Sequence, residues 1–107
     1  MADAADYIEN VQKYAPDATL ETVAKIVKHL GIALSSKDAS LVSCSDPSEL
    51  ERVRESWLKK KLALEQPDAE LDASVSAICS AMSAEHNKQR VTFYYLIAAH
   101  HGKLDSL

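Results

Sequence analysis

The side chains best suited to chemistry lie in a polar connection just before the middle of the sequence. Residues 35–46 are rich in serine and contain no glycine, and loops held by a rigid scaffold often carry function. The candidate ligand-binding residues are Lys37, Asp38, Ser43, Cys44 and Arg52. In one interpretation, Ser43 and Cys44 lie beside Arg52 in a cleft that binds a small anion. In the other, which we take as the default, the serines cap the next helix and satisfy loop amides.

The metal-ligating and thiol side chains show no motif. They are Cys44, Cys79, His29, His86, His100 and His101. None shows the Cys-x-x-Cys or His-x-x-x-His spacing that places two ligands on one metal, and two isolated thiols are typical of a reducing cytosol. With only two glycines, a glycine-rich phosphate loop is excluded. We predict reduced cysteines, no metal, no cofactor and no catalytic residue. Nucleophilic catalysis would need Cys44 or a serine near a histidine and an acid, and only the fold decides whether such groups meet.

Basic residues cluster between residues 52 and 61. They are Arg52, Arg54, Lys59, Lys60 and Lys61, and the acids Glu49, Glu51 and Glu55 lie among or before them. Acids early and bases late suit the dipole of a helix, so a solvated helix face explains the cluster. The net charge of -4 also disfavours contact with nucleic-acid phosphates.

The elements that would position these side chains centre on residues 45–64, which carry the only tryptophan. Asp46 can cap a helix there, and Pro47 suits its first position, where no amide donor is needed. Apolar residues then recur at spacings of three and four: Leu50, Val53, Trp57, Leu58, Leu62 and Leu64. This period is typical of an amphipathic helix that other helices must cover.

The whole chain of 107 residues reads as one all-α domain, a compact bundle with frayed ends near residues 1–2 and 105–107. Two glycines and three prolines suit helices joined by short turns. We predict five helices, over residues 3–14, 18–30, 47–64, 69–82 and 88–101. The predicted core contains Ile26, Leu30, Val53, Trp57, Ile78, Tyr95 and Ala98. The last helix has almost no polar face, so it should be buried on most sides.

The connection from residue 32 to 44 is the hardest segment to assign. We expect a short helical turn near residues 37–41, with Leu41 and Val42 in the core and Lys37 and Asp38 at the surface. A weak duplication also runs through the chain. Arg-Val-x-x-x-aromatic-Leu occurs at residues 52–58 and again at 90–96. Chance is the simple alternative to two pseudo-repeated helical hairpins.

Three segments carry a resemblance to a known family: residues 28–34 (KHLGIAL), 36–46 (SKDASLVSCSD) and 90–96 (RVTFYYL). With them, nearly the whole chain resembles a bacterial family of small proteins, common in alpha-proteobacteria, that is known only as a domain of unknown function. The resemblance implies a small cytoplasmic helical protein. It implies no activity, ligand or catalytic residue.

The sequence leads to two functional hypotheses. The first is a non-enzymatic interaction module that binds another protein or itself, since catalytic motifs are missing and apolar side chains are plentiful. The second is a nucleic-acid or phosphate-ligand binder; it would use Arg52, Lys59, Lys60, Lys88 and Arg90. No apolar run could cross a bilayer, and the first residues lack the pattern of a secretory signal. We therefore expect a cytoplasmic protein with no membrane contact.

Overall fold

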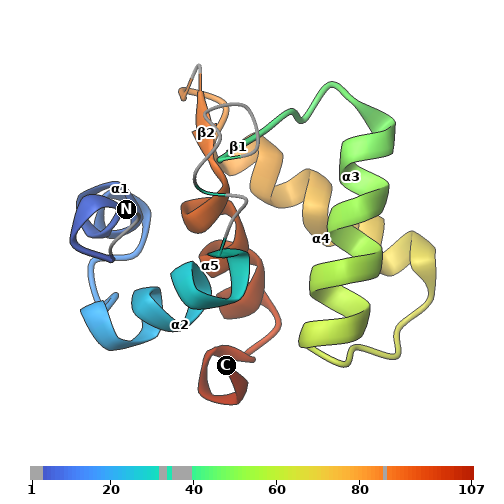
Figure 1. Ribbon diagram of the computed structural model, residues 1–107. Coiled ribbons are helices and arrows are strands. Elements are labelled where there is room, and N and C mark those ends of the chain that lie inside the picture. Colours follow the sequence, from blue (N-terminus) through green and yellow to red (C-terminus); the bar gives the residue numbers. More distant parts are fainter. Residues whose placement is uncertain (1–3, 32–33, 35–39, 86) are drawn as a thin grey trace.

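Helix α5 (Arg90–His100) runs through the middle of the fold and supplies much of its core (Figure 1). Helices α1 (Ile8–Tyr14), α2 (Leu20–Leu30) and α4 (Asp68–Ala81) pack against it from different sides. Its buried residues are Val91, Thr92, Phe93, Tyr94, Tyr95, Ile97 and Ala98. The prediction that the last helix is buried on most sides is confirmed.

This computed structural model describes residues 4–31, 34, 40–85 and 87–107. Over that part of the chain the fold is all-α, with five α-helices and one two-stranded sheet, as the helical pattern predicted. Short 3₁₀ turns at Ala4–Asp6 and Leu104–Ser106 lie near the two ends.

The helix ends follow local chemistry. The Thr19 hydroxyl accepts a hydrogen bond from the Thr22 amide at 3.3 Å, so Thr19 caps α2. Gly31 ends that helix with φ of 48°, a value that glycine adopts without strain. Helix α4 begins at Asp68, and Pro67 stands before it.

Helix α3 (Pro47–Val53) begins as predicted, because the Ser48 amide donates to the Asp46 carboxylate at 3.0 Å and Pro47 follows the cap. The helix predicted over residues 47–64 continues to Lys61, but beyond Val53 it is not an α-helix. Residues Arg54–Lys61 form a π-helix, whose backbone bonds reach five residues.

Apolar spacing accounts for this change. The Leu62 amide bonds to the Trp57 carbonyl at 2.9 Å, five residues back. Val53 and Leu58 are also five residues apart, and all four side chains are buried. A π-helix brings residues at this spacing onto one face, whereas an α-helix turns them apart. Ala63, with φ of 53°, follows the segment.

Two short strands form an unpredicted sheet. Strand β1 (Leu41–Val42) pairs antiparallel with β2 (Lys88–Gln89), so that Leu41 faces Gln89 and Val42 faces Lys88. The helical turn expected near residues 37–41 is therefore wrong at Leu41, and residues 37–39 lie outside the described part. Val42 is buried as expected, while Leu41 is half-buried.

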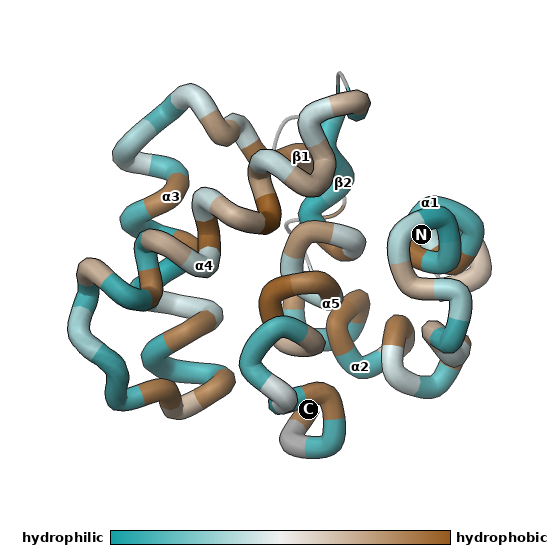
Figure 2. Tube along the Cα trace, turned by 180° about the vertical axis from the view of Figure 1, so that it is seen from behind, coloured by the Kyte–Doolittle hydropathy of each residue, from teal (hydrophilic) through white to brown (hydrophobic). Residues whose placement is uncertain are grey.

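The core forms where α5 meets the helices around it. Trp57, Ile26, Val53 and Ala98 are fully buried, and Ile78 and Tyr95 nearly so; of the predicted core only Leu30 is half-buried. Figure 2 shows hydrophobic stretches of α5 at the centre and alternating hydrophilic stretches on the outer helices. Hydrophobic periodicity thus identified most of the core correctly.

The two copies of Arg-Val-x-x-x-aromatic-Leu occupy different helical settings. The copy at residues 52–58 runs from α3 into the π-helix, whereas the copy at 90–96 opens α5. Val53 and Val91 are both fully buried. The shared pattern therefore marks a similar apolar face in two differently wound helices.

Candidate functional site

A surface groove separates α3 from α4. Its volume is about 460 Å³, and its lining residues are Pro47, Leu50, Glu51, Arg54, Asp72, Val75 and Ser76. Ligand sites in proteins are typically concavities of about 300–1,000 Å³ with an apolar lining and a few polar groups. The groove therefore has the size of a binding site, with a lining that is more polar than is typical.

Helical spacing places these side chains on two facing walls. Pro47, Leu50 and Arg54 recur at intervals of three and four residues on one wall. Asp72, Val75 and Ser76 share the corresponding face of α4. The half-buried Leu50 and the exposed Pro47 supply apolar surface on the α3 wall, whereas Val75 on α4 is only 1% exposed and offers almost none.

Arg54 joins the two walls. Its Nη1 donates to both carboxylate oxygens of Asp72 at 3.0 Å, and its Nε donates to Glu55 at 3.0 Å. Asp68 lies 3.7 Å from Nη2, and the Arg54 side chain is only 15% exposed. The hydrogen bonds that Arg54 donates to Glu55 and Asp72 raise its pKa. The guanidinium is therefore already surrounded by carboxylates.

Lys59 extends this network. Its ammonium lies 2.7 Å from Asp68 and 2.8 Å from Glu55. Hydrogen bonding to Lys59 is the main reason that the pKa values of both carboxylates are lowered. With Glu51 and Asp72 in the groove lining, two cations face four carboxylates here. The rim is therefore acidic.

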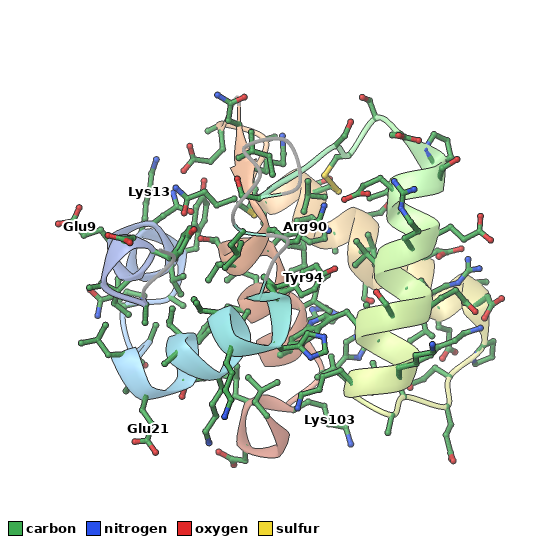
Figure 3. All side chains as sticks on the ribbon, viewed as in Figure 1. Glu9, Lys13, Glu21, Arg90, Tyr94 and Lys103 are labelled. Carbon is green, nitrogen blue, oxygen red and sulfur yellow. A yellow bond between two sulfur atoms is a disulfide. The ribbon has the colours of Figure 1, made fainter. Side chains whose placement is uncertain are left out.

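A disulfide between Cys44 and Cys79 closes one end of the region. Their Cα atoms are 6.0 Å apart, and 35 residues of sequence separate them. Figure 3 shows the yellow sulfur–sulfur bond between the chain that enters α3 and helix α4. The prediction of two isolated thiols is wrong. The sequence spacing of the two cysteines does not predict that they pair. Only the packing of α3 against α4 brings them together.

The predicted ligand-binding residues that the structure describes, Ser43, Cys44 and Arg52, do not line the groove. The Ser43 hydroxyl lies 3.4 Å from that of Ser45, Cys44 is in the disulfide, and the 71% exposed Arg52 side chain pairs with Glu49. Lys37 and Asp38 lie outside the described residues. The anion cleft around Arg52 therefore stays a prediction, and its thiol is committed to Cys79.

A buried carboxylate, which sequence analysis placed among solvated charges, links three elements. Glu49 is 8% exposed and accepts hydrogen bonds from Arg52, at 2.9 Å, and from Arg90. Arg90 also donates to the Leu41 carbonyl at 3.0 Å and to the Tyr94 hydroxyl at 3.2 Å. Burial alone would raise the pKa of Glu49, but the hydrogen bonds from both arginines outweigh burial and lower it.

The basic residues of the phosphate-binding hypothesis have partners within the protein. Arg52 and Arg90 bind Glu49, Lys59 lies between Glu55 and Asp68, and Lys88 donates to the Glu85 carbonyl at 3.0 Å. Lys60 is exposed. A phosphate would therefore compete with acceptors already bound to most of these groups.

A serine–histidine pair invites comparison with a nucleophile and its base. His101 Nε2 lies 2.9 Å from Ser74 Oγ. However, Ser74 donates its own proton to the Leu71 carbonyl at 2.7 Å and is only 5% exposed. The serine thus acts as a buried acceptor for His101, which ties the end of α5 to α4. Among the described residues no group of three His, Cys, Asp or Glu side chains could hold a metal ion.

The outer surface has little apolar area. In the described ranges Leu20, at 54%, is the only exposed large hydrophobic residue. The surplus of apolar surface expected from the sequence is therefore not seen there. No helix in the same ranges is long and apolar enough to pass through a bilayer.

Comparison with known proteins gives one match. No curated protein matches the sequence. Residues 6–105 match the model of a family described as "Protein of unknown function (DUF2853)". Since this match spans nearly the whole chain, including both walls of the groove, the chain belongs to the DUF2853 family of proteins of unknown function.

Proposed function

We propose that this protein is a non-enzymatic binding module whose α3–α4 groove holds a short segment of another protein. The segment would place an apolar side chain against Leu50 and Pro47 and a lysine or arginine against the acidic rim. The observation that carries this proposal is a groove of about 460 Å³ in which the half-buried Leu50 lies beside the carboxylates of Glu51 and Asp72.

The charge of the groove favours a basic partner. Glu51 is exposed at the rim, and Asp72 keeps an exposed side chain beside Arg54. Because Arg54 is already paired with carboxylates, an anionic ligand would have to displace them. A cation would compete with Arg54 and Lys59 at the paired carboxylates, but Glu51 lies at the rim outside their ion pairs, so charge complementarity there points to Lys or Arg on the partner.

The size of the site favours a weak and transient complex. One groove and a single exposed large hydrophobic, Leu20, in the described ranges offer far less than the area of a stable interface. We therefore expect recognition of a short peptide segment, with self-association as the competing outcome. The second hypothesis, binding of a nucleic acid or phosphate ligand, has less support because its cations are paired.

The module would act as one domain. A cytoplasmic location and a bacterial origin, expected from the sequence, stay predictions. The Cys44–Cys79 bond counts against a cytoplasmic location unless it is transient. Disulfides persist mainly in oxidising compartments, and those of the cytosol are usually transient.

The test is a titration of ¹⁵N-labelled protein with two matched peptide panels. In one panel Leu or Phe is flanked by Lys and Arg, and in the other the same apolar residue is flanked by Glu. We expect the basic panel to shift amide signals of Leu50, Glu51, Val75 and Ser76, and the shifts to weaken with salt. Equal responses to both panels, or shifts centred elsewhere, would refute the proposal.

Groove variants sharpen the test. Ser76→Tyr should fill the groove, and Glu51→Lys should repel the basic panel; each should weaken binding at least tenfold. The matched controls are Ala77→Tyr, at an exposed neighbouring position outside the lining, and Glu21→Lys on α2. Figure 3 places Glu21 on a distant part of the molecule, so this charge reversal should leave binding unchanged. Sedimentation at high concentration would detect self-association.

A further inference from the structure

We infer that the Cys44–Cys79 bond is a site of thiol–disulfide exchange, open to a dithiol reductant, that controls the mouth of the groove. The inference rests on the proposed role of the groove as the binding site. In the oxidised form the two walls are clamped together. In the reduced form residues 43–48 are released, and peptide binding weakens.

The position of the bond supports this control. Cys44 lies three residues before Pro47, and Cys79 lies three residues after Ser76, about one helical turn. The bond therefore joins the two wall-forming elements directly at one end of the groove. A covalent link at this point limits how far α3 can move from α4.

The two cysteines differ in what else holds them. Cys79 belongs to α4, which is anchored in the core by Leu71, Val75 and Ile78. Cys44 lies in a short connection whose neighbours Ser43, Ser45 and Asp46 are exposed. Breaking the bond would therefore free the Cys44 side and leave the α4 side in place.

Two anchors would confine the released segment. Before it, Val42 is buried and paired with Lys88 in the sheet. After it, Glu49 is bound to Arg90 on α5. Reduction should then loosen residues 43–48 while the rest of the fold persists. Such a change is a local and reversible opening of the structure.

The Cys44–Cys79 bond is accessible to a reductant and can re-form after reduction. Each cysteine is half-buried, so neither is sealed in the core. The chain contains only these two cysteines, so reoxidation has one intramolecular product. Their Cα separation of 6.0 Å is within the usual span of a disulfide, so the reduced thiols would lie within reach of each other.

The exchange follows ordinary thiol chemistry. One thiolate of the reductant attacks one of the two sulfurs, which breaks the Cys44–Cys79 bond and forms a mixed disulfide. The displaced cysteine leaves as a thiolate and takes a proton. The second thiol of the reductant, as its thiolate, then attacks the mixed disulfide and releases the other cysteine. The protein gains two electrons and two protons, and the dithiol becomes a cyclic disulfide.

Hydrogen exchange tests, without any ligand, whether reduction of the Cys44–Cys79 bond releases residues 43–48. Folded protein is compared before and after treatment with dithiothreitol in the absence of denaturant. We expect full reduction, exchange at least tenfold faster for amides of residues 43–48, and unchanged exchange in α5. A bond that dithiothreitol reduces only in denaturant, unchanged exchange at 43–48, or loss of the helical circular dichroism signal on reduction would each overturn the inference.

The double variant Cys44→Ser/Cys79→Ser gives the matched control. It should show the exchange pattern of the reduced protein and should not respond to dithiothreitol. Binding of the basic peptide panel should weaken about tenfold on reduction of the wild type, since part of the preorganisation is lost. Equal peptide binding by the oxidised and reduced forms would refute the inference that the disulfide controls the groove. If neither form binds peptide, the proposed function fails. The hydrogen-exchange data still decide whether reduction releases residues 43–48.

Discussion

Trp57 and Tyr94 form the central contact between the π-helix and α5. The indole N–H donates to the Tyr94 carbonyl at 3.1 Å, and the two rings stack with their centroids 4.6 Å apart. Trp57 is fully buried, so one side chain supplies both apolar contact and a hydrogen bond to a helix backbone.

Truncation of Trp57 should therefore be severe. Trp57→Ala should lower the free energy of unfolding by about 3–5 kcal/mol, because it leaves a large cavity. Trp57→Phe keeps part of the apolar contact and loses the N–H donor, so its cost should be smaller. Urea unfolding measures both. A loss below about 1 kcal/mol for the alanine variant would contradict a hub role for Trp57.

Removal of the Glu49 carboxylate should destabilise the junction of α3, β1 and α5. Glu49→Gln should cost roughly 3 kcal/mol, because the largely buried Arg90 would lose its ion pair with Glu49. Arg52→Ala is the matched control: Arg52 binds the other oxygen of the same carboxylate, but its side chain is largely exposed. Chemical denaturation should show little change for this control. Similar losses in both variants would place the effect at Arg52 instead.

Stability should fall as the solution is acidified from about pH 7 toward pH 5.5. Burial, with a smaller contribution from Lys61, lowers the pKa of His29. Burial, followed by His100 and Lys103, lowers the pKa of His101. The unfolded chain therefore binds more protons just below the ordinary histidine pKa of about 6.5, which favours unfolding there.

The double variant His29→Gln/His101→Gln should flatten this dependence. The carboxylates with lowered pKa values, such as Glu49, titrate below this window, so the stability that they contribute is lost, and adds to acid unfolding, only at lower pH. Denaturation curves at pH 7.5, 6.5 and 5.5 measure the slope. An unchanged slope in the double variant would show that other groups carry the pH dependence.

The disulfide should contribute to global stability even though its release is local. Because the bond closes a loop across 35 residues, reduction should lower the free energy of unfolding by about 2–4 kcal/mol, chiefly by freeing the unfolded chain. Urea unfolding with and without dithiothreitol measures this difference, with the double serine variant as the reduced reference. A difference near zero would show that strain in the folded state offsets the entropy.

Local signals such as the Asp46–Pro47 helix start could be read from the sequence because each acts over a few residues. Thr19 and Asp46 cap helices through amides two or three residues away, and Gly31 ends α2 by its own backbone freedom. The apolar period likewise placed Val53, Trp57 and Ala98 in the core. These features determined the all-α class and four helix starts to within a few residues.

The tertiary structure decided what depends on distant partners. Leu41 is in a strand because Gln89, 48 residues later, pairs with it, and Cys44 is bonded to Cys79 because α3 packs against α4. Glu49 is buried because Arg90 reaches it from α5. The groove also exists only between two helices, so neither wall reveals it alone. Periodicity shows which face of a helix is buried, but the meeting of two faces is a long-range contact, whose free energy depends on the whole packed core.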